Sequence, residues 1–247
     1  MEIKELKIIT PSYKRADNIK AKEVFGDKLI IACHEFEEKE YRENNPENEL
    51  MVLPDSLRWN MAKVRNYMKD NCNSKYLLMI DDDVREIGYF ENSEKHKFER
   101  LDEILDFIEK WYNLAEELGT CLWGMQLNDD RLCYREYSPF SFHSPILWPF
   151  SWHIVDKDLH YDERLGLNED YDYFIQCINK YRKVLRFNKY YYVAGHLTDK
   201  WGCGAYRLLD NERKQAEIMM KKWWKKVVKY NLGKSTNPII HIPIKGI

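Results

Sequence analysis

Short apolar runs and amphipathic segments alternate along the first third of the chain. The apolar runs at residues 6–10, 28–33, 50–54 and 76–80 have the length of buried strands. Amphipathic stretches at 11–26 and 56–72 have the spacing of helices, and Gly26 predicts where the first one ends. Strands and helices repeated at this spacing predict a parallel sheet with right-handed crossovers.

The rest of the chain shows a less regular pattern. Helices are expected over 101–118, 169–181 and 204–230, the last of them long and amphipathic. Strands are expected over 121–127, 190–195 and 239–244, and over 146–155 with a break at Pro149. Without repeats or low-complexity linkers, the chain is expected to be one α/β domain with a mixed, mainly parallel sheet flanked by helices.

Composition narrows the class of protein. No apolar run approaches the roughly 20 residues of a membrane span, and residues 1–7 do not resemble a signal peptide. Six cysteines without a CxxC pair predict reduced thiols rather than disulfides or a structural zinc site. These features predict a soluble, cytoplasmic protein without a membrane partner. The net charge of −2 means that any contact with nucleic acid requires a local basic patch.

Three consecutive aspartates, Asp81–Asp83, follow the apolar run at 76–80. Adjacent like charges cost energy unless water, a cation or hydrogen-bond donors offset them. Ligands of open parallel sheets bind beyond the carboxyl ends of the strands, and clustered carboxylates there suit Mg²⁺ or Mn²⁺ with a phosphate-bearing substrate. The strand context favours such a site over a solvated acidic turn.

Two further features carry candidate chemistry. Glu169, Asp170 and Asp172 cluster at the start of a predicted helix, whose positive end favours anions. Helix capping explains part of this cluster, but a carboxylate there is also placed to take a proton from an acceptor hydroxyl. His196 follows a predicted strand and Gly195, where a neutral imidazole can complete a metal shell, although a lone histidine is more often structural.

The order of these motifs resembles that of GT-A-fold, nucleotide-sugar-dependent glycosyltransferases. The resemblance rests on "IITPSYKRADNI", "MAKVRNYMKDNCNSKYLLMIDDD" and "NEDYDYFIQCI", and it spans about Leu6 to Asp199. It implies a single GT-A-like domain over 1–247, with a nucleotide-binding half at 1–90 and an acceptor-side half at 91–247.

The resemblance also implies roles for matching residues. Asp170 would be the base of an inverting enzyme, with Glu169 as a second catalytic candidate. Asp81, Asp83 and His196 would hold Mn²⁺ or Mg²⁺. The nucleotide-sugar, expected to be a UDP-sugar, would contact Thr10, Pro11, Ser12, Tyr13, Arg15, Arg65, Asp81 and Asp82. Two departures stand out: "RWN" replaces the glycine that many relatives have before Arg65, and the triple aspartate leaves open which two carboxylates act.

The C-terminal third bears on the acceptor. "WGCGAYR" and the sequence around it resemble phage-type glycosyltransferases, including the TET/JBP-associated group, that act on hydroxymethylpyrimidines in DNA. This implies DNA as the acceptor and, for a phage protein, the host cytoplasm as the location. Trp148, Trp152 and Trp201 are candidates to hold a flipped base. The other candidate acceptor contacts are Gly202 and Arg207.

The segment 221–229 is expected to be amphipathic, with lysines 221, 222, 225, 226 and 229 on one helical face and Trp223, Trp224, Val227 and Val228 on the other. A solvated lysine face is the simpler interpretation. Contact of these lysines with nucleic-acid phosphates is the alternative.

Three other functions stay open. A GT-A enzyme can act on a glycan, lipid or protein, and a metal-dependent nucleotidyltransferase also places carboxylates at strand ends. The absence of glycine in "TPSYKRADN" disfavours the nucleotidyltransferase. A non-catalytic binding module has no reason to keep two costly acidic clusters. The sequence does not predict the oligomeric state.

Overall fold

The computed structural model describes residues 5–92, 94–126, 129–195, 209–231 and 237–242. The helices are α1 (Ala21–Phe25), α2 (Glu38–Asn44), α3 (Met61–Asn71), α4 (Leu101–Glu117), α5 (Glu169–Tyr181) and α6 (Leu209–Val227). The strands are β1 (Leu6–Pro11), β2 (Leu29–His34), β3 (Leu50–Leu53), β4 (Tyr76–Ile80), β5 (Glu86–Glu91), β6 (Glu94–Lys97), β7 (Leu122–Gln126), β8 (Phe140–Ser141), β9 (Phe150–Ile154), β10 (Leu185–Val193), β11 (Val228–Lys229) and β12 (Ile239–Ile240).

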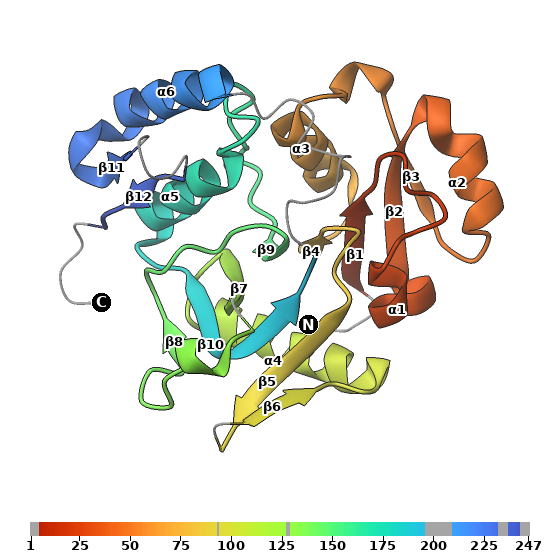
Figure 1. The fold of residues 1–247 in the computed structure, drawn as a ribbon, viewed down its shortest axis with the longest axis horizontal. Helices are drawn as coiled ribbons and strands as arrows, with labels where there is room; N and C mark the ends of the chain where they lie inside the picture. Colours follow the sequence, from red (N-terminus) through yellow and green to blue (C-terminus); the bar gives the residue numbers. More distant parts are fainter. Residues whose placement is uncertain (1–4, 93, 127–128, 196–208, 232–236, 243–247) are drawn as a thin grey trace.

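Within the described residues, ten strands form one mixed sheet in the order β3-β2-β1-β4-β9-β7-β10-β5-β6, with β8 beside β10. Strands β3, β2, β1 and β4 are parallel, as the spacing of the first apolar runs predicted. Strand β9 then lies antiparallel between β4 and β7, and so joins the two parts of the sheet (Figure 1). The expected mixed sheet flanked by helices is confirmed.

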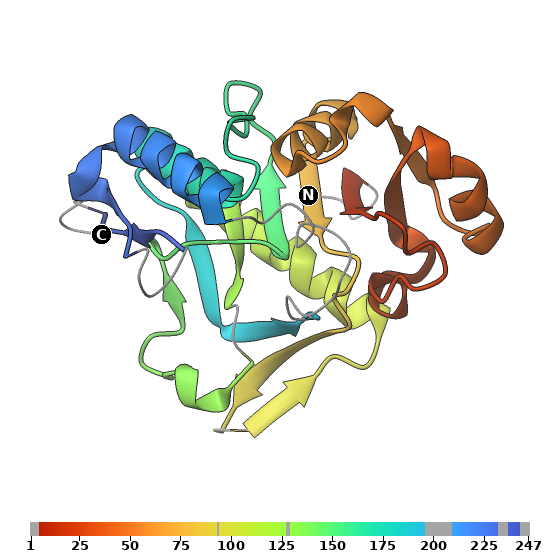
Figure 2. The same cartoon turned by 45° about the horizontal axis from the view of Figure 1, so that its top comes forward.

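Each face of the sheet is covered by its own set of helices. Leu78 and Ile80 of β4 pack into the core that α1, α2 and α4 cover, whereas Leu77 and Met79 pack into the core under α3, α5 and α6. Strand β4 is apolar at every position because both of its faces are buried. Figures 1 and 2 show α6 alongside α5 at one end of the molecule, with α1 and α2 at the other.

Several elements differ from the expectations. The helix expected within 11–26 is confined to α1, and α3 starts only at Met61, because the side chain of Asn60 caps it by accepting a hydrogen bond from Lys63 N. Helix α2 and the hairpin of β5 and β6 were not expected, since both are rich in charged residues. Strand β10 begins at Leu185, five residues before the expected start.

The end of α6 does not have the expected separation of faces. Trp224 has φ 62° and ψ 149°, a conformation that interrupts the helix. Such a backbone is close to the region that only glycine adopts readily, and it costs about 1–3 kcal/mol for other residues. Trp224 is 72% exposed, and the lysine and tryptophan faces predicted for one continuous helix are therefore wrong.

Two expectations drawn from composition can be compared with the described residues. Cys33, Cys72, Cys121, Cys133 and Cys177 are free thiols, as expected, and Cys203 lies outside the described residues. In the part of the chain that the structure describes, no helix is both long and apolar enough to cross a bilayer.

A neutral histidine lies deep in the core between the sheet and α5. His153 of β9 is fully buried, with its Nε2 3.0 Å from Ser151 Oγ and 3.4 Å from Tyr161 Oη. Burial lowers the pKa of His153 to about 3, and the positive charges of Lys69 and Arg65 act in the same direction. The folded protein thus excludes a proton that an unfolded histidine binds below a pH of about 6.5.

This difference predicts a loss of stability in acid. Because the unfolded state binds the proton first, His153 lowers the free energy of unfolding by about 1.4 kcal/mol for each pH unit below about 6.5, down to a pH of about 3. His153→Gln keeps hydrogen-bonding capacity but cannot titrate. Urea unfolding between pH 7 and pH 4 should show a flatter pH dependence for this variant. The exposed His143→Gln is the control, and equal pH dependence in both variants would contradict the prediction.

Candidate functional site

The three aspartates after β4 have different partners. The carboxylate of Asp82 is 7% exposed and accepts hydrogen bonds from Ser12 Oγ at 2.7 Å and from Arg15 Nη1 at 2.8 Å. Tyr41 Oη in turn donates to Ser12 Oγ at 2.8 Å. Asp82 therefore fixes the loop that follows β1, so that its carboxylate is occupied within the protein.

Asp81 and Asp83 flank this anchored residue. Asp81 N donates to Pro149 O at 3.0 Å, which fixes the backbone at the end of β4. Burial raises the pKa of Asp81 to about 7, and the charge of Arg65 opposes this rise. Asp83 lies against Gly195, where an added Cβ would come within 2.9 Å of Asp83 Oδ2. Only glycine lets the backbone after β10 approach this carboxylate so closely.

Arg65 of α3 connects the aspartates to the second acidic cluster. Its guanidinium is buried, donates from Nη1 to Glu169 Oε1 at 2.5 Å and lies with Cζ 3.5 Å from the centre of the Trp148 ring. Its positive charge opposes the rise that burial causes in the pKa values of both Asp81 and Asp170. One cation thus acts on carboxylates from β4 and from α5.

The three acidic residues at the start of α5 also have different partners. Glu169 is 5% exposed and holds Arg65, and Asp172 is fully buried and holds side chains of α6. Asp170 Oδ1 accepts a hydrogen bond from Tyr171 N at 2.7 Å, and burial raises the pKa of Asp170. A carboxylate with a raised pKa is suited to accept a proton, whereas the carboxylate of Glu169 is engaged in an ion pair.

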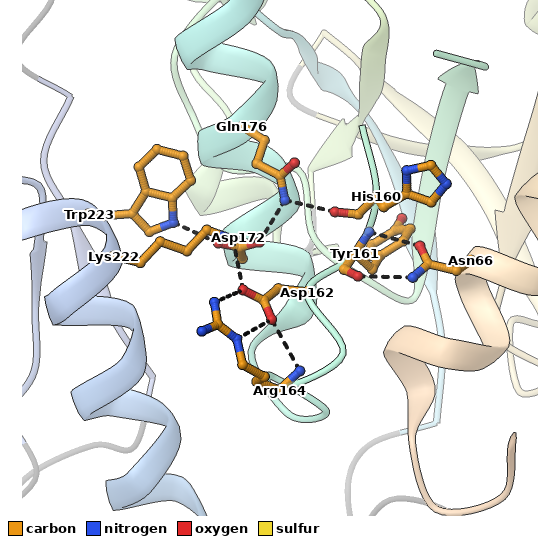
Figure 3. A network of polar contacts seen from close by, with 9 residues as sticks. All are labelled: Asn66, His160, Tyr161, Asp162, Arg164, Asp172, Gln176, Lys222 and Trp223. Atoms are coloured by element: carbon orange, nitrogen blue, oxygen red, sulfur yellow. Dashed lines mark hydrogen bonds and ion pairs between the residues drawn. The ribbon is translucent and has the colours of Figure 1, made fainter. Parts of the chain in front are cut away.

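Figure 3 shows how Asp172 joins α5 to α6. It accepts hydrogen bonds from Trp223 Nε1 at 2.6 Å, Lys222 Nζ at 2.9 Å and Gln176 Nε2 at 2.7 Å. Lys222 also reaches Asp162 at 2.9 Å. These contacts fix the end of α6 to the first turn of α5, two residues from Asp170.

The arrangement of carboxylates fits a divalent cation that is partly held by substrate. Burial raises the pKa values of Asp81 and Asp170, and a bound cation would stabilise the charged form of both carboxylates. Among the described residues, no group of three or more His, Cys, Asp or Glu side chains is arranged to hold a metal. Mg²⁺ commonly uses one or two carboxylates together with phosphate oxygens and water, and Asp81 and Asp83 can supply the two.

The expected donor-binding loop lies at the ends of β1 and β2. Thr10 and Ser12 are buried, while the ring of Tyr13 makes edge contacts with the rings of Phe36 and Trp59 at centroid distances of 6.1 and 5.5 Å. Phe36 and Trp59 are about half exposed. Together with Pro11 and Arg15, the whole predicted segment therefore gathers beside Asp82, next to an aromatic surface that the sequence pattern did not reveal.

The expected acceptor contacts have mixed outcomes. Trp152 is fully buried, with its ring packed against Phe107 of α4, so the expectation that it contacts an acceptor is wrong. Trp148 covers Arg65 at the site. The other acceptor candidates, Trp201, Gly202 and Arg207, lie outside the described residues, as does the metal-ligand candidate His196.

Sequence reasoning also missed Tyr192 of β10, because the apolar run around it predicts only a strand. Its ring stacks on Phe150 at a centroid distance of 5.2 Å, and its buried hydroxyl has no hydrogen-bond partner among the described residues. Burial raises the pKa of Tyr192, and the charges of Asp81, Asp170 and Asp83 raise it further. Because Phe150 pairs with Ile80, the residue before Asp81, the ring of Tyr192 lies at the end of β4.

The buried pair of Arg65 and Glu169 should be important for stability. Arg65→Met leaves the Glu169 carboxylate buried without its partner, and we expect it to lower the free energy of unfolding by about 3–5 kcal/mol. Adding Glu169→Gln to Arg65→Met should restore part of this loss, since the unpaired charge is then gone. Urea denaturation of the single and double variants measures both effects.

The exposed pair of Arg42 and Glu38, with Nη2 2.6 Å from Oε1, provides the control. Arg42→Met should change stability by less than about 1 kcal/mol, because solvent screens an exposed pair. Equal losses for Arg65→Met and Arg42→Met would show that the buried pair is not important for stability.

Solved structures of several glycosyltransferases share the fold of this chain. A mannosyltransferase from Pyrobaculum calidifontis, solved with GDP-Man and Mn²⁺, has a TM-score of 0.57 at 12% identity, over 88% of this chain and 64% of its own. Glucosyl-3-phosphoglycerate synthase from Mycobacterium tuberculosis has a TM-score of 0.54 at 9% identity, over 96% and 86%. The fold is thus that of the GT-A glycosyltransferases, as expected.

The chain is shorter than some of these proteins, since it spans 65% of the chain of S. aureus TarS and 64% of that of the mannosyltransferase. No curated protein matches the sequence. The model of the family described as TET-Associated Glycosyltransferase matches residues 6–203. Over this range lie β4 with its aspartates, Arg65 and the start of α5, and the chain belongs to the TET-associated glycosyltransferase family.

Proposed function

We propose that this protein transfers a sugar from a nucleotide-sugar, with a UDP-sugar as the expected donor, to the hydroxymethyl group of a 5-hydroxymethylpyrimidine in DNA. The observation that carries the proposal is the convergence of two acidic clusters on one buried arginine, in a chain of this family. The choice of DNA as acceptor is supported by the family description and by the C-terminal sequence resemblance.

In the proposed reaction the loop after β1 binds the nucleotide of the donor. Asp82 holds that loop in place through hydrogen bonds from Ser12 and Arg15. Asp81 and Asp83 hold a divalent cation, Mn²⁺ or Mg²⁺. When bound, such a cation neutralises charge that develops on the leaving diphosphate. The different partners of the three aspartates support these roles. The carboxylate of Asp82 already accepts hydrogen bonds from Ser12 and Arg15, which leaves Asp81 and Asp83 as the candidates for the cation.

Asp170 acts as the base on the acceptor side. As the hydroxymethyl oxygen forms its bond to the anomeric carbon, the bond from that carbon to the diphosphate oxygen breaks, and Asp170 takes the hydroxyl proton. This is a single displacement that inverts the anomeric configuration. The raised pKa of Asp170 supports this role, whereas Glu169 positions Arg65.

The proposal predicts a specific pattern of labelling. Radiolabelled UDP- and GDP-sugars, offered with Mn²⁺, should label DNA that contains 5-hydroxymethylcytosine or 5-hydroxymethyluracil and should not label unmodified DNA. EDTA should abolish transfer. Hydrolysis of the donor without labelled DNA would exclude these acceptors and point to a glycan, lipid or protein. If the protein neither binds nor hydrolyses any of these donors, the assignment of Asp81 and Asp83 to a metal site fails, and a non-catalytic binding module becomes the leading alternative.

Single carboxylate variants test the assigned roles. Asp170→Asn removes the base while keeping the shape of the side chain, and transfer should fall by about 10²–10⁴-fold with donor binding retained. Asp83→Asn should abolish the dependence of donor binding on Mn²⁺. Asp102→Asn, at an exposed position of α4, should leave both properties unchanged. Full turnover in Asp170→Asn would exclude Asp170 as the base.

A further inference from the structure

Residues 221–229, at the end of α6 and in the two residues after it, carry the exposed Trp224 and four exposed lysines, and we refer to these five residues as the basic surface. The lysines are Lys221, Lys225, Lys226 and Lys229. Among the described residues these four lysines have no ion-pair partner. Lys222, the fifth lysine of this stretch, is turned inward to Asp162 and Asp172 and does not belong to the surface.

Trp224, which lies between Lys221 and Lys225 in the sequence, is 72% exposed. Its backbone has φ 62° and ψ 149°, which a residue other than glycine adopts only at a cost. Burial does not account for the tryptophan, because most of its surface faces solvent. A large exposed ring in the same short segment as four cations is suited to a ligand that combines phosphates with sugar rings.

Contacts on both sides of the surface anchor it to α5, the helix that carries the candidate base. Before it, Trp223 Nε1 donates to Asp172 in the first turn of α5. After it, Tyr230 packs against the same hydrophobic core as Tyr171 of α5. The segment 224–229 is therefore held at both ends to the core beneath α5.

We propose that Trp224 and the four lysines around it form a docking surface for double-stranded DNA, the acceptor of the proposed reaction. The lysines contact the phosphates of the duplex, and the ring of Trp224 packs against the deoxyribose of a backbone nucleotide. This inference rests on the proposed function for the identity of the partner. Charge complementarity supports the choice, because DNA carries a phosphate charge at every nucleotide.

The test measures binding without catalysis. The anisotropy of a fluorescein-labelled, unmodified duplex of about 20 bp is followed between about 50 and 200 mM NaCl. Lys225→Gln/Lys226→Gln should weaken binding and reduce the slope of log Kd against log salt by about 2, since each lost phosphate contact removes about 1. The control, Lys39→Gln/Lys97→Gln, removes the same charge from exposed positions on α2 and β6 and should leave the slope unchanged.

Trp224→Gly separates binding from folding. Glycine suits the backbone at this position, so the variant should be at least as stable to urea as the wild type. Its affinity for the duplex should nevertheless fall about fivefold or more, with an unchanged salt slope, because an apolar contact is lost rather than a charge. Hydrolysis of the nucleotide-sugar by water, which needs no acceptor, should be unaffected.

The outcomes distinguish this inference from the proposed function. If the wild type binds the duplex and the Lys225/Lys226 variant matches its control, the docking surface is excluded while DNA remains a possible acceptor. If the wild type hydrolyses donors but binds no duplex, the DNA proposal and the docking surface both fail and the transferase stands. Binding of these lysines to phosphatidylserine vesicles, with no binding to the duplex, would assign the surface to a membrane instead.

Discussion

The guanidinium of Arg65 is the interaction on which the site depends. It is buried between the end of β4 and the start of α5, where it bonds Glu169 and moderates the pKa values of Asp81 and Asp170. Without it, several carboxylates would have to be buried with no neighbouring positive charge, which is costly in a medium of low dielectric. The same residue also joins α3 to α5, which carries the candidate base.

Each acidic cluster contains carboxylates that hold other parts of the chain in place and carboxylates that are candidates for metal binding or catalysis. After β4, Asp82 holds the loop of Ser12 and Arg15. At the start of α5, Glu169 holds Arg65 and Asp172 holds α6. The carboxylates of Asp82, Glu169 and Asp172 accept hydrogen bonds from distant parts of the chain. These bonds fix the positions of the neighbouring Asp81, Asp83 and Asp170. A run of negative charge that is costly by itself is thus held in one fixed arrangement.

The parallel half of the sheet and the position of the aspartates could be predicted because each depends on local pattern. An apolar strand of five residues followed by three aspartates needs no distant information to interpret. The pairing of Arg65 with Glu169 joins residues 104 positions apart, and no local spacing indicates it. The burial of Trp152 could not be predicted either. An aromatic residue near Pro149 gives the same sequence pattern whether it faces a ligand or, as Trp152 does, the core. The break at Trp224 escaped prediction because the surrounding residues favour a continuous helix.

The place of β9 in the sheet has a consequence for the synthesis of the chain. Strand β4 pairs with β1 on one side and with β9 on the other, and Ile80 lies opposite Phe150. While the ribosome makes the residues between them, the apolar β4 has one edge without a partner, the kind of edge that promotes association between chains. The nascent protein therefore completes the sheet around β4 only after residues 150–154 have been made. Truncations that stop before Phe150 would leave an aggregation-prone edge rather than an independently stable N-terminal unit.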